Sequence, residues 1–306
     1  SAASVKTLVY GDSIFIHSKS LNEQHHYLSV EIGENYQGRF RINSNTLKFA
    51  LPKNTQGTII TVYKDTEASN GSILFQGITA ERISIPEIIE KSTIEFIGNS
   101  ITCGMGADAR EIACKDGEWY DQHNAYLAYG PRVARALNVD FLLNCVSGMG
   151  FYRNWNDENE AVMADVYPSL RLDGNTGEMS KKENTGPEVV SISLGTNDLS
   201  LGDGIKARTD LNQETFTQSY ISFVEMIFRK YPNTKVALLS SPMIGEKENE
   251  ILISSLRMVK EHFNKEEIFI YEFEKMEPGG CTSHPDIQDH EEMAKKLIPF
   301  FKEILN

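Results

Sequence analysis

Five short apolar segments alternate with longer amphipathic segments in the C-terminal two-thirds of the chain, and this alternation restricts the fold more than any other feature. The apolar segments lie at residues 94–97, 141–143, 189–192, 236–239 and 268–271. Runs this short and this apolar are typical of strands buried on both faces, and helices between such strands are typical of βαβ units. We therefore predict an α/β fold with a five-stranded, parallel, doubly wound sheet.

The segments between these strands predict the helices that cover the sheet. Apart from a helix at the C-terminus, we expect helices at about residues 125–137, 213–231 and 249–264. In the C-terminal helix Met293, Leu297, Phe301 and Leu305 recur at four-residue spacing and form one apolar stripe. Asp286 or Asp289 is expected to cap its first turn.

The N-terminal part has a different pattern, with strand-like segments separated by turns. These segments are residues 8–10, 27–32, 40–42, 58–63 and 72–75. Asn70-Gly71 favours a type I′ hairpin turn between the last two. We predict a small antiparallel β-sandwich, jelly-roll-like, at residues 1–88, followed by the α/β domain at residues 89–306.

Charge excludes some classes of partner. The chain has 30 basic and 43 acidic residues, a formal net charge of −13, which disfavours nucleic acid and anionic membranes as partners. No apolar run of about 18 residues predicts a membrane-spanning helix, and we expect no membrane insertion. The first residues do not have the pattern of a signal peptide.

The four cysteines, Cys103, Cys114, Cys145 and Cys281, lack the short paired spacing of a zinc site, and no metal site is predicted. Four cysteines can pair in three ways, and we predict free, buried thiols. A disulfide between Cys103 and Cys281 is the alternative that would imply an exported protein.

Two candidate catalytic side chains follow the first and the last strand. Ser100 stands in a glycine-rich turn, where a hydroxyl can project as a nucleophile, although a serine there also serves as a helix cap. His284 lies in a loop before the terminal helix and can act as a general base, although a lone histidine is more often structural. In parallel sheets the ends of the strands meet at one edge.

Two candidate oxyanion donors follow the second and third strands. Gly148 has no side chain to screen its N–H, and the Asn197 amide can donate to the same oxygen. Each has an ordinary alternative, a turn glycine and an Asx-turn.

These four blocks together resemble those of SGNH (GDSL-type) hydrolases and, more closely, carbohydrate esterase family two. The segments that carry the resemblance are IEFIGNSITCGMG (94–106), YLAYG (126–130), SGMGFYRN (147–154) and LGTND (194–198). The resemblance implies a β-sandwich joined to a flavodoxin-like domain and deacetylation of plant polysaccharides. It implies Ser100 as nucleophile, His284 as base, and the Ser100 N–H, Gly148 N–H and Asn197 amide as oxyanion donors. It implies no metal and no organic cofactor.

The sequence departs from the SGNH pattern in two places. Asn99 replaces the aspartate before the nucleophile, where we expect little loss. Many SGNH enzymes carry an aspartate two or three positions before the histidine, but here Thr282 and Cys281 stand there. We therefore predict a Ser-His dyad in which a backbone carbonyl orients the imidazole, and we assign Asp286 to the helix cap.

The function expected is a serine esterase that removes acetyl or other short acyl groups from an acetylated oligo- or polysaccharide. Tyr152, Arg153 and Trp155 follow the oxyanion glycine and are candidates to line the sugar site, with Trp119 a further candidate. A folded-back loop with a core tryptophan is the ordinary alternative. A lipid acyl-esterase or thioesterase, and a carbohydrate-binding protein with a decayed catalytic centre, remain as alternatives. The compartment expected is secreted or periplasmic.

Overall fold

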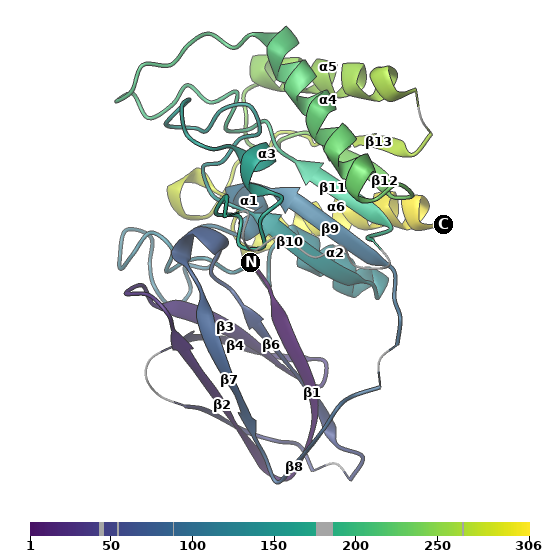
Figure 1. The fold of residues 1–306 in the computed structure, drawn as a ribbon. Coiled ribbons are helices and arrows are strands. Elements are labelled where there is room, and N and C mark those ends of the chain that lie inside the picture. The colour runs from purple at the N-terminus through teal and green to yellow at the C-terminus, as the bar shows by residue number, and fades with distance from the viewer. Residues whose placement is uncertain (43–45, 54, 88, 176–185, 265) are drawn as a thin grey trace.

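A β-sandwich and a parallel α/β sheet lie one beneath the other in the computed structural model, as Figure 1 shows. The structure describes residues 1–42, 46–53, 55–87, 89–175, 186–264 and 266–306. The last strand of the sandwich ends at Ser84 and the first strand of the parallel sheet begins at Thr93. The proposed boundary at residue 88 falls between them, on a residue outside the described ranges.

The predicted antiparallel sandwich is present and consists of two sheets. The larger sheet has the order β4-β3-β6-β1-β8 and the smaller one the order β5-β2-β7. The strands are β1 (Ser4–Tyr10), β2 (Ser13–Ser20), β3 (His26–Ile32), β4 (Asn35–Ile42), β5 (Leu47–Ala50), β6 (Thr58–Lys64), β7 (Ile73–Thr79) and β8 (Arg82–Ser84). Alternate side chains such as Val9, Ile14, Ile16, Val30 and Ile60 fill the space between the sheets. Strands β2, β5 and β8 were not predicted.

The predicted hairpin at Asn70-Gly71 is wrong. Strand β6 pairs with β1 and β3 in the larger sheet, whereas β7 pairs with β2 in the smaller sheet. Between them, Ala68–Asn70 forms a 3₁₀ turn (η1), and the side chain of Asn22 donates to the Asn70 carbonyl at 2.7 Å. The segment carries the chain from one layer to the other, which a two-residue hairpin turn does not do.

All five predicted strands of the α/β domain are present, and they are parallel. They are β9 (Thr93–Gly98), β10 (Asp140–Cys145), β11 (Val189–Ser193), β12 (Lys235–Leu239) and β13 (Ile268–Tyr271). Their order, β10-β9-β11-β12-β13, is the flavodoxin-like arrangement, in which the connections diverge at β9. The crevice at that point is where ligands bind in such sheets.

Helices cover both faces of this sheet. On one face α2 (Tyr129–Leu137) and α6 (Ile287–Leu305) pack against Phe96 and Leu239. On the other, α4 (Gln213–Lys230) and α5 (Glu246–Phe263) pack with α3 (Met163–Val166) against Ile97 and Leu238. Successive residues of a strand thus pack into the cores on opposite faces of the sheet, which explains why the strand segments are apolar throughout.

The caps and boundaries of two helices show what the sequence did and did not predict. Met293, Leu297 and Phe301 of the α6 stripe are buried, and Asp286 caps α6 by accepting hydrogen bonds from the backbone of Gln288 and Asp289, as predicted. Helix α2, however, begins at Tyr129 rather than at residue 125.

The residues just before α2 bind the sandwich instead of extending the helix. The Tyr126 N–H donates to the Asp65 carboxylate of the sandwich at 3.0 Å, and the Leu127 N–H donates to the Asn124 side chain at 2.9 Å. The sandwich also meets the edge strand β10, where the rings of Tyr63 and Phe141 stack.

The prediction of free thiols is wrong, because all four cysteines form disulfides. Cys103 of α1 (Ser100–Cys103) pairs with Cys145 at the end of β10, and Cys114 pairs with Cys281, with Cα atoms 5.6 and 5.2 Å apart. Cys103 and Cys281 are not bonded to each other. Disulfides are typical of proteins from oxidising compartments.

Within the described ranges, no helix has the length and apolar character needed to cross a membrane.

Candidate active site

Ser100 and His284 are in direct contact. Ser100 is the first residue of α1, directly after β9, and the Asn99 side chain accepts the Ile101 N–H at 3.1 Å and so holds this turn. His284 follows the short 3₁₀ turn η2 (Cys281–Ser283). Its Nε2 lies 2.8 Å from the Ser100 Oγ, across 184 residues of sequence. This is the geometry by which a general base takes a proton from a nucleophile.

A backbone carbonyl orients the imidazole, in the arrangement expected for a dyad. The Nδ1 of His284 lies 2.9 Å from the Thr282 carbonyl oxygen and 3.2 Å from the Thr282 hydroxyl. Thr282 and Ser283 have φ values of 53° and 57°, in the left-handed region that non-glycine residues rarely adopt. Donation of Nδ1–H to the carbonyl places the lone pair of Nε2 toward Ser100.

The pKa of His284 lies below the ordinary value for histidine. Burial is the main cause, because it disfavours the imidazolium, and the nearby His123 adds to it. The Thr282 carbonyl and Glu67 act in the opposite direction without cancelling the effect of burial. A neutral imidazole is the form that can accept the Ser100 proton.

The loop that carries Gly148 is held close to Asn197. The Asn197 side chain donates to the Met149 carbonyl at 2.8 Å, and the backbone N–H of Trp155 donates to the Gly148 carbonyl at 3.0 Å. Gly148 has a φ of 77°, and a Cβ on it would lie 2.5 Å from Cδ1 of Trp155. A glycine is therefore needed here both for its conformation and for the close approach of the indole.

Tyr152 and Arg153 form hydrogen bonds with the loop that follows β11. Their backbone N–H groups donate to one oxygen of the Asp198 carboxylate, at 2.8 and 3.0 Å. Burial raises the pKa of Asp198 to about 6 against the effect of these hydrogen bonds. The Arg153 guanidinium is buried and donates to the carbonyls of Asp198 and Thr209 and to Glu158. These contacts show that the Arg153 side chain holds this loop together. Its predicted contact with sugar stays a prediction.

Sequence reasoning missed two buried residues near the dyad, Glu67 and His123. The Nε2 of His123 lies 3.4 Å from Oε2 of Glu67, and both side chains are completely buried. Trp119 packs edge-on against the His123 ring, with centroids 5.0 Å apart. Nothing in the local sequence distinguishes Glu67, because its partners come from two distant loops.

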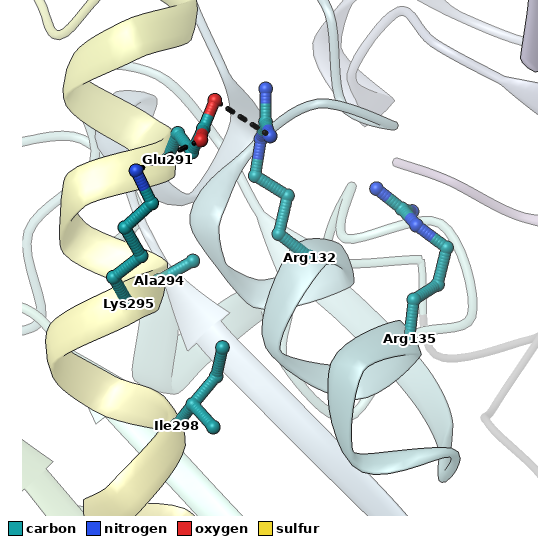
Figure 2. A pocket seen from close by; sticks show the side chains of 6 residues that line it. All are labelled: Arg132, Arg135, Glu291, Ala294, Lys295 and Ile298. Atoms are coloured by element: carbon teal, nitrogen blue, oxygen red, sulfur yellow. Dashed lines mark ion pairs between the residues drawn. The ribbon is translucent and has the colours of Figure 1, made fainter.

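The pocket in Figure 2 lies between α2 and α6, and neither Ser100 nor His284 lines it. It has a volume of about 340 Å³ and is lined by Arg132, Arg135, Glu291, Ala294, Lys295 and Ile298. Arg132 and Lys295 both pair with Glu291, at 3.7 and 3.0 Å, so one carboxylate faces the three cationic side chains of the lining. In the part of the chain that the structure describes, no group of three or more histidine, cysteine or acidic residues is arranged to hold a metal ion.

Comparison of sequences finds known esterases that are similar to this chain. An acetylxylan esterase/glucomannan deacetylase of Cellvibrio japonicus is 27% identical over 243 residues, which is 76% of this chain and 65% of the relative. The cellulase/esterase CelE of Acetivibrio thermocellus is also 27% identical, over 99% of this chain and 37% of its own length. The chain thus spans about two-thirds or less of the curated relatives it matches.

Comparison of structures supports the same fold over the whole chain. A family two carbohydrate esterase from Clostridium thermocellum, solved in complex with cellohexaose, superposes with a TM-score of 0.85 at 24% identity, covering 100% of this chain and 93% of that one. A family two carbohydrate esterase from Cellvibrio japonicus superposes with a TM-score of 0.84 at 20% identity, covering 99% and 89%.

A family model decides the assignment. The model of the GDSL-like lipase/acylhydrolase family matches residues 96–264, more than half of the chain, and includes Ser100, Gly148 and Asn197. The fold is that of the family two carbohydrate esterases, and the chain belongs to the GDSL-like lipase/acylhydrolase family.

Proposed function

We propose that this protein is a serine esterase that removes acetyl or other short acyl groups from carbohydrate. The observation that carries the proposal is the contact of 2.8 Å between Oγ of Ser100 and Nε2 of His284, together with the Thr282 carbonyl 2.9 Å from Nδ1. A hydroxyl, a base and a group that orients the base are the minimum needed for acyl transfer through a serine.

The proposed reaction has two steps. His284 takes the proton of Ser100 as Oγ attacks the ester carbonyl, and the N–H groups of Ser100 and Gly148 and the amide of Asn197 donate to the developing oxyanion. His284 then protonates the leaving sugar hydroxyl as the bond to it breaks. In the second step His284 takes a proton from water as the water attacks the acyl-enzyme. His284 then returns this proton to Oγ of Ser100 as the bond between Oγ and the acyl carbon breaks, which releases the carboxylic acid.

Exposed aromatic rings support carbohydrate as the substrate class. Trp119 and Trp155, the two tryptophans of the chain, are 46% and 39% exposed. Trp155 covers Gly148, and Trp119 packs on His123, which contacts Glu67. Planar rings of this kind pack against the apolar faces of sugar rings, and the name of the Cellvibrio japonicus relative, an acetylxylan esterase/glucomannan deacetylase, points to acetylated polysaccharides as the substrate class.

The two disulfides support an oxidising compartment. We therefore place the protein among secreted or periplasmic enzymes, where polymeric carbohydrate is accessible.

Hydrolysis of 4-nitrophenyl acetate compared with the octanoate ester tests the proposal, with Ser100→Ala and His284→Ala as controls. Preference for acetate, lost in both variants, together with acetate release from acetylated xylan or mannan, is the expected result. Preference for octanoate would instead favour a lipid acyl-esterase or thioesterase. A folded protein that hydrolyses neither ester but binds glycans would favour a carbohydrate-binding protein with an inactive centre.

A further inference from the structure

Glu67 is a carboxylate of the sandwich that is buried against the α/β domain. It lies between β6 and η1, and none of its surface is exposed. An ionised carboxylate in such a position needs several hydrogen-bond donors to offset the loss of hydration. The donors that Glu67 finds belong to residues far away in the sequence.

The main partner of Glu67 is Ser147, next to the proposed oxyanion glycine. The Ser147 N–H lies 3.1 and 3.2 Å from the two oxygens of Glu67, and the Ser147 hydroxyl donates to Oε2. The Ser69 hydroxyl donates to Oε1 from the sandwich side, and His123 lies at ion-pair distance from Oε2. Both oxygens of the carboxylate are therefore engaged.

These contacts keep Glu67 ionised. Burial alone raises its pKa, but the interaction with His123 and the hydrogen bonds from Ser147 and Ser69 outweigh burial, so the pKa lies below the ordinary value for glutamate. A charged acceptor holds an N–H and an O–H more strongly than a neutral one does.

Glu67 completes a set of contacts that hold the backbone of residues 147–150. The Met149 N–H donates to the Val146 carbonyl, and the Gly150 N–H donates to the Asn154 side chain. The Ser147 N–H is held by Glu67. Among the residues described, the Gly148 N–H is the one N–H of this loop for which no acceptor is found.

We propose that Glu67 is a positioning residue, which fixes the Ser147 peptide so that the neighbouring Gly148 N–H is presented to the oxyanion of the substrate. The sandwich thereby supplies part of the catalytic arrangement rather than only packing beside the α/β domain. This inference rests on the proposed esterase function. His123 and Ser69 contact the Glu67 carboxylate from other directions and hold it in place.

The expected effect is on the transition state rather than on substrate binding. Removal of one oxyanion donor lowers kcat by about 10²-fold to 10³-fold in enzymes where it has been tested, and displacement of the Gly148 N–H acts in the same direction. The ester carbonyl of the bound substrate carries little negative charge, so KM is expected to change little.

The test compares four single variants with the parent protein, in hydrolysis of 4-nitrophenyl acetate. Glu67→Gln turns one acceptor into a donor facing Ser147, and we expect kcat to fall at least tenfold with KM within threefold. Ser147→Ala removes one of the bonds and is expected to lower kcat by less. Ser147→Thr keeps the hydroxyl and should retain activity close to that of the parent. Ser222→Ala removes an exposed serine hydroxyl of α4 that donates to the Gln218 carbonyl of the same helix, and it is the matched control.

Affinity for a boronic acid, which forms a tetrahedral adduct with Ser100, provides a second readout. We expect this affinity to fall in Glu67→Gln in parallel with kcat. If Glu67→Gln does not fold, the inference is tested by the difference in kcat between Ser147→Ala and Ser147→Thr, which leave the sandwich unchanged. Unchanged kcat and boronic acid affinity in folded Glu67→Gln, or equal kcat for the two Ser147 variants, would overturn the inference. Failure of the esterase proposal is distinct, since the parent protein itself would then be inactive.

Discussion

The Nδ1 atom of His284 lies 2.9 Å from the carbonyl oxygen of Thr282, two residues earlier in the same loop. In many SGNH hydrolases a carboxylate occupies this role, but the position three residues before His284 is Cys281, which is bonded to Cys114. A neutral carbonyl orients the imidazole yet stabilises an imidazolium less than a carboxylate does. The conformation of this loop therefore places a backbone carbonyl beside Nδ1, where many SGNH hydrolases have a carboxylate side chain.

Substitutions at Thr282 are expected to separate the role of its carbonyl from that of its hydroxyl. Thr282→Ala removes the hydroxyl 3.2 Å from Nδ1 but keeps the carbonyl, so kcat/KM should stay within about threefold. Thr282→Pro cannot adopt the observed φ of 53°, so the carbonyl moves and kcat/KM should fall by about 10²-fold or more. Steady-state kinetics with 4-nitrophenyl acetate check both values. Equal activity of the two variants would contradict the proposed orienting role.

The pH dependence of the reaction is expected to follow His284. Burial lowers its pKa from the ordinary 6.5, and only the neutral imidazole can act as base. Activity is therefore present above the lowered pKa and is lost as the pH falls through it. A profile of kcat/KM against pH should show an acid limb with its midpoint below 6.5. A midpoint above that value would show that another group or a charged partner controls the titration.

Removal of the Cys114–Cys281 disulfide is expected to affect both stability and catalysis. The bond joins the segment after α1 to the loop that carries Thr282 and His284, across 167 residues of sequence. In the Cys114→Ser, Cys281→Ser double variant, the free energy of unfolding should fall by about 2–4 kcal/mol. The value of kcat, measured well below the melting temperature, should fall as well. A loss of stability with unchanged kcat would mean that the disulfide does not hold the histidine loop.

A side chain at Gly148 is expected to damage the oxyanion site. Its Cβ would lie 2.5 and 2.7 Å from two atoms of the Trp155 ring, in a backbone with a φ of 77°. We expect Gly148→Ala to lower kcat by about 10²-fold. Gly33→Ala is the matched control, because Gly33 also has a positive φ of 64° but no atom within 4 Å of its added Cβ. If both variants lose activity equally, general backbone strain rather than the oxyanion site is responsible.

Trp119 is expected to contribute to binding of carbohydrate but not to the chemical step. Trp119→Ala should raise KM for an acetylated oligosaccharide about threefold to tenfold, the effect of losing one ring contact, with little change for 4-nitrophenyl acetate. Ile85→Ala, which removes another exposed apolar side chain, at 85% exposure, is the control. Equal effects on both substrates would show that Trp119 holds the structure of the site and does not contact the sugar.

Elements with a local signal were predicted well. The five apolar segments became the five parallel strands, and Asp286 caps α6. Ser100 and His284 were selected from loops after different strands, and the structure brings them to 2.8 Å. The strand and cap predictions succeeded because strand periodicity and helix capping depend on neighbouring residues. Ser100 and His284 lie close together because parallel strands end at one edge of the sheet.

Elements that depend on tertiary contacts were missed. Asn70-Gly71 has the composition of a hairpin turn, but the chain there crosses between two sheets. Helix α2 starts late because the backbone of Tyr126 donates to Asp65 in the sandwich. In each case a tertiary contact outweighs the local preference.

The sequence alone determined the alternation of strands and helices in the α/β domain, and it proposed the residues of the candidate active site. Only the tertiary structure decided which cysteines pair, which group contacts Nδ1 of His284, and that Glu67 of the sandwich binds Ser147 beside Gly148. The physical reason is that periodicity and motifs record interactions between residues near in sequence. A buried carboxylate or a disulfide instead depends on which distant backbone groups the packing of two domains brings within bonding distance.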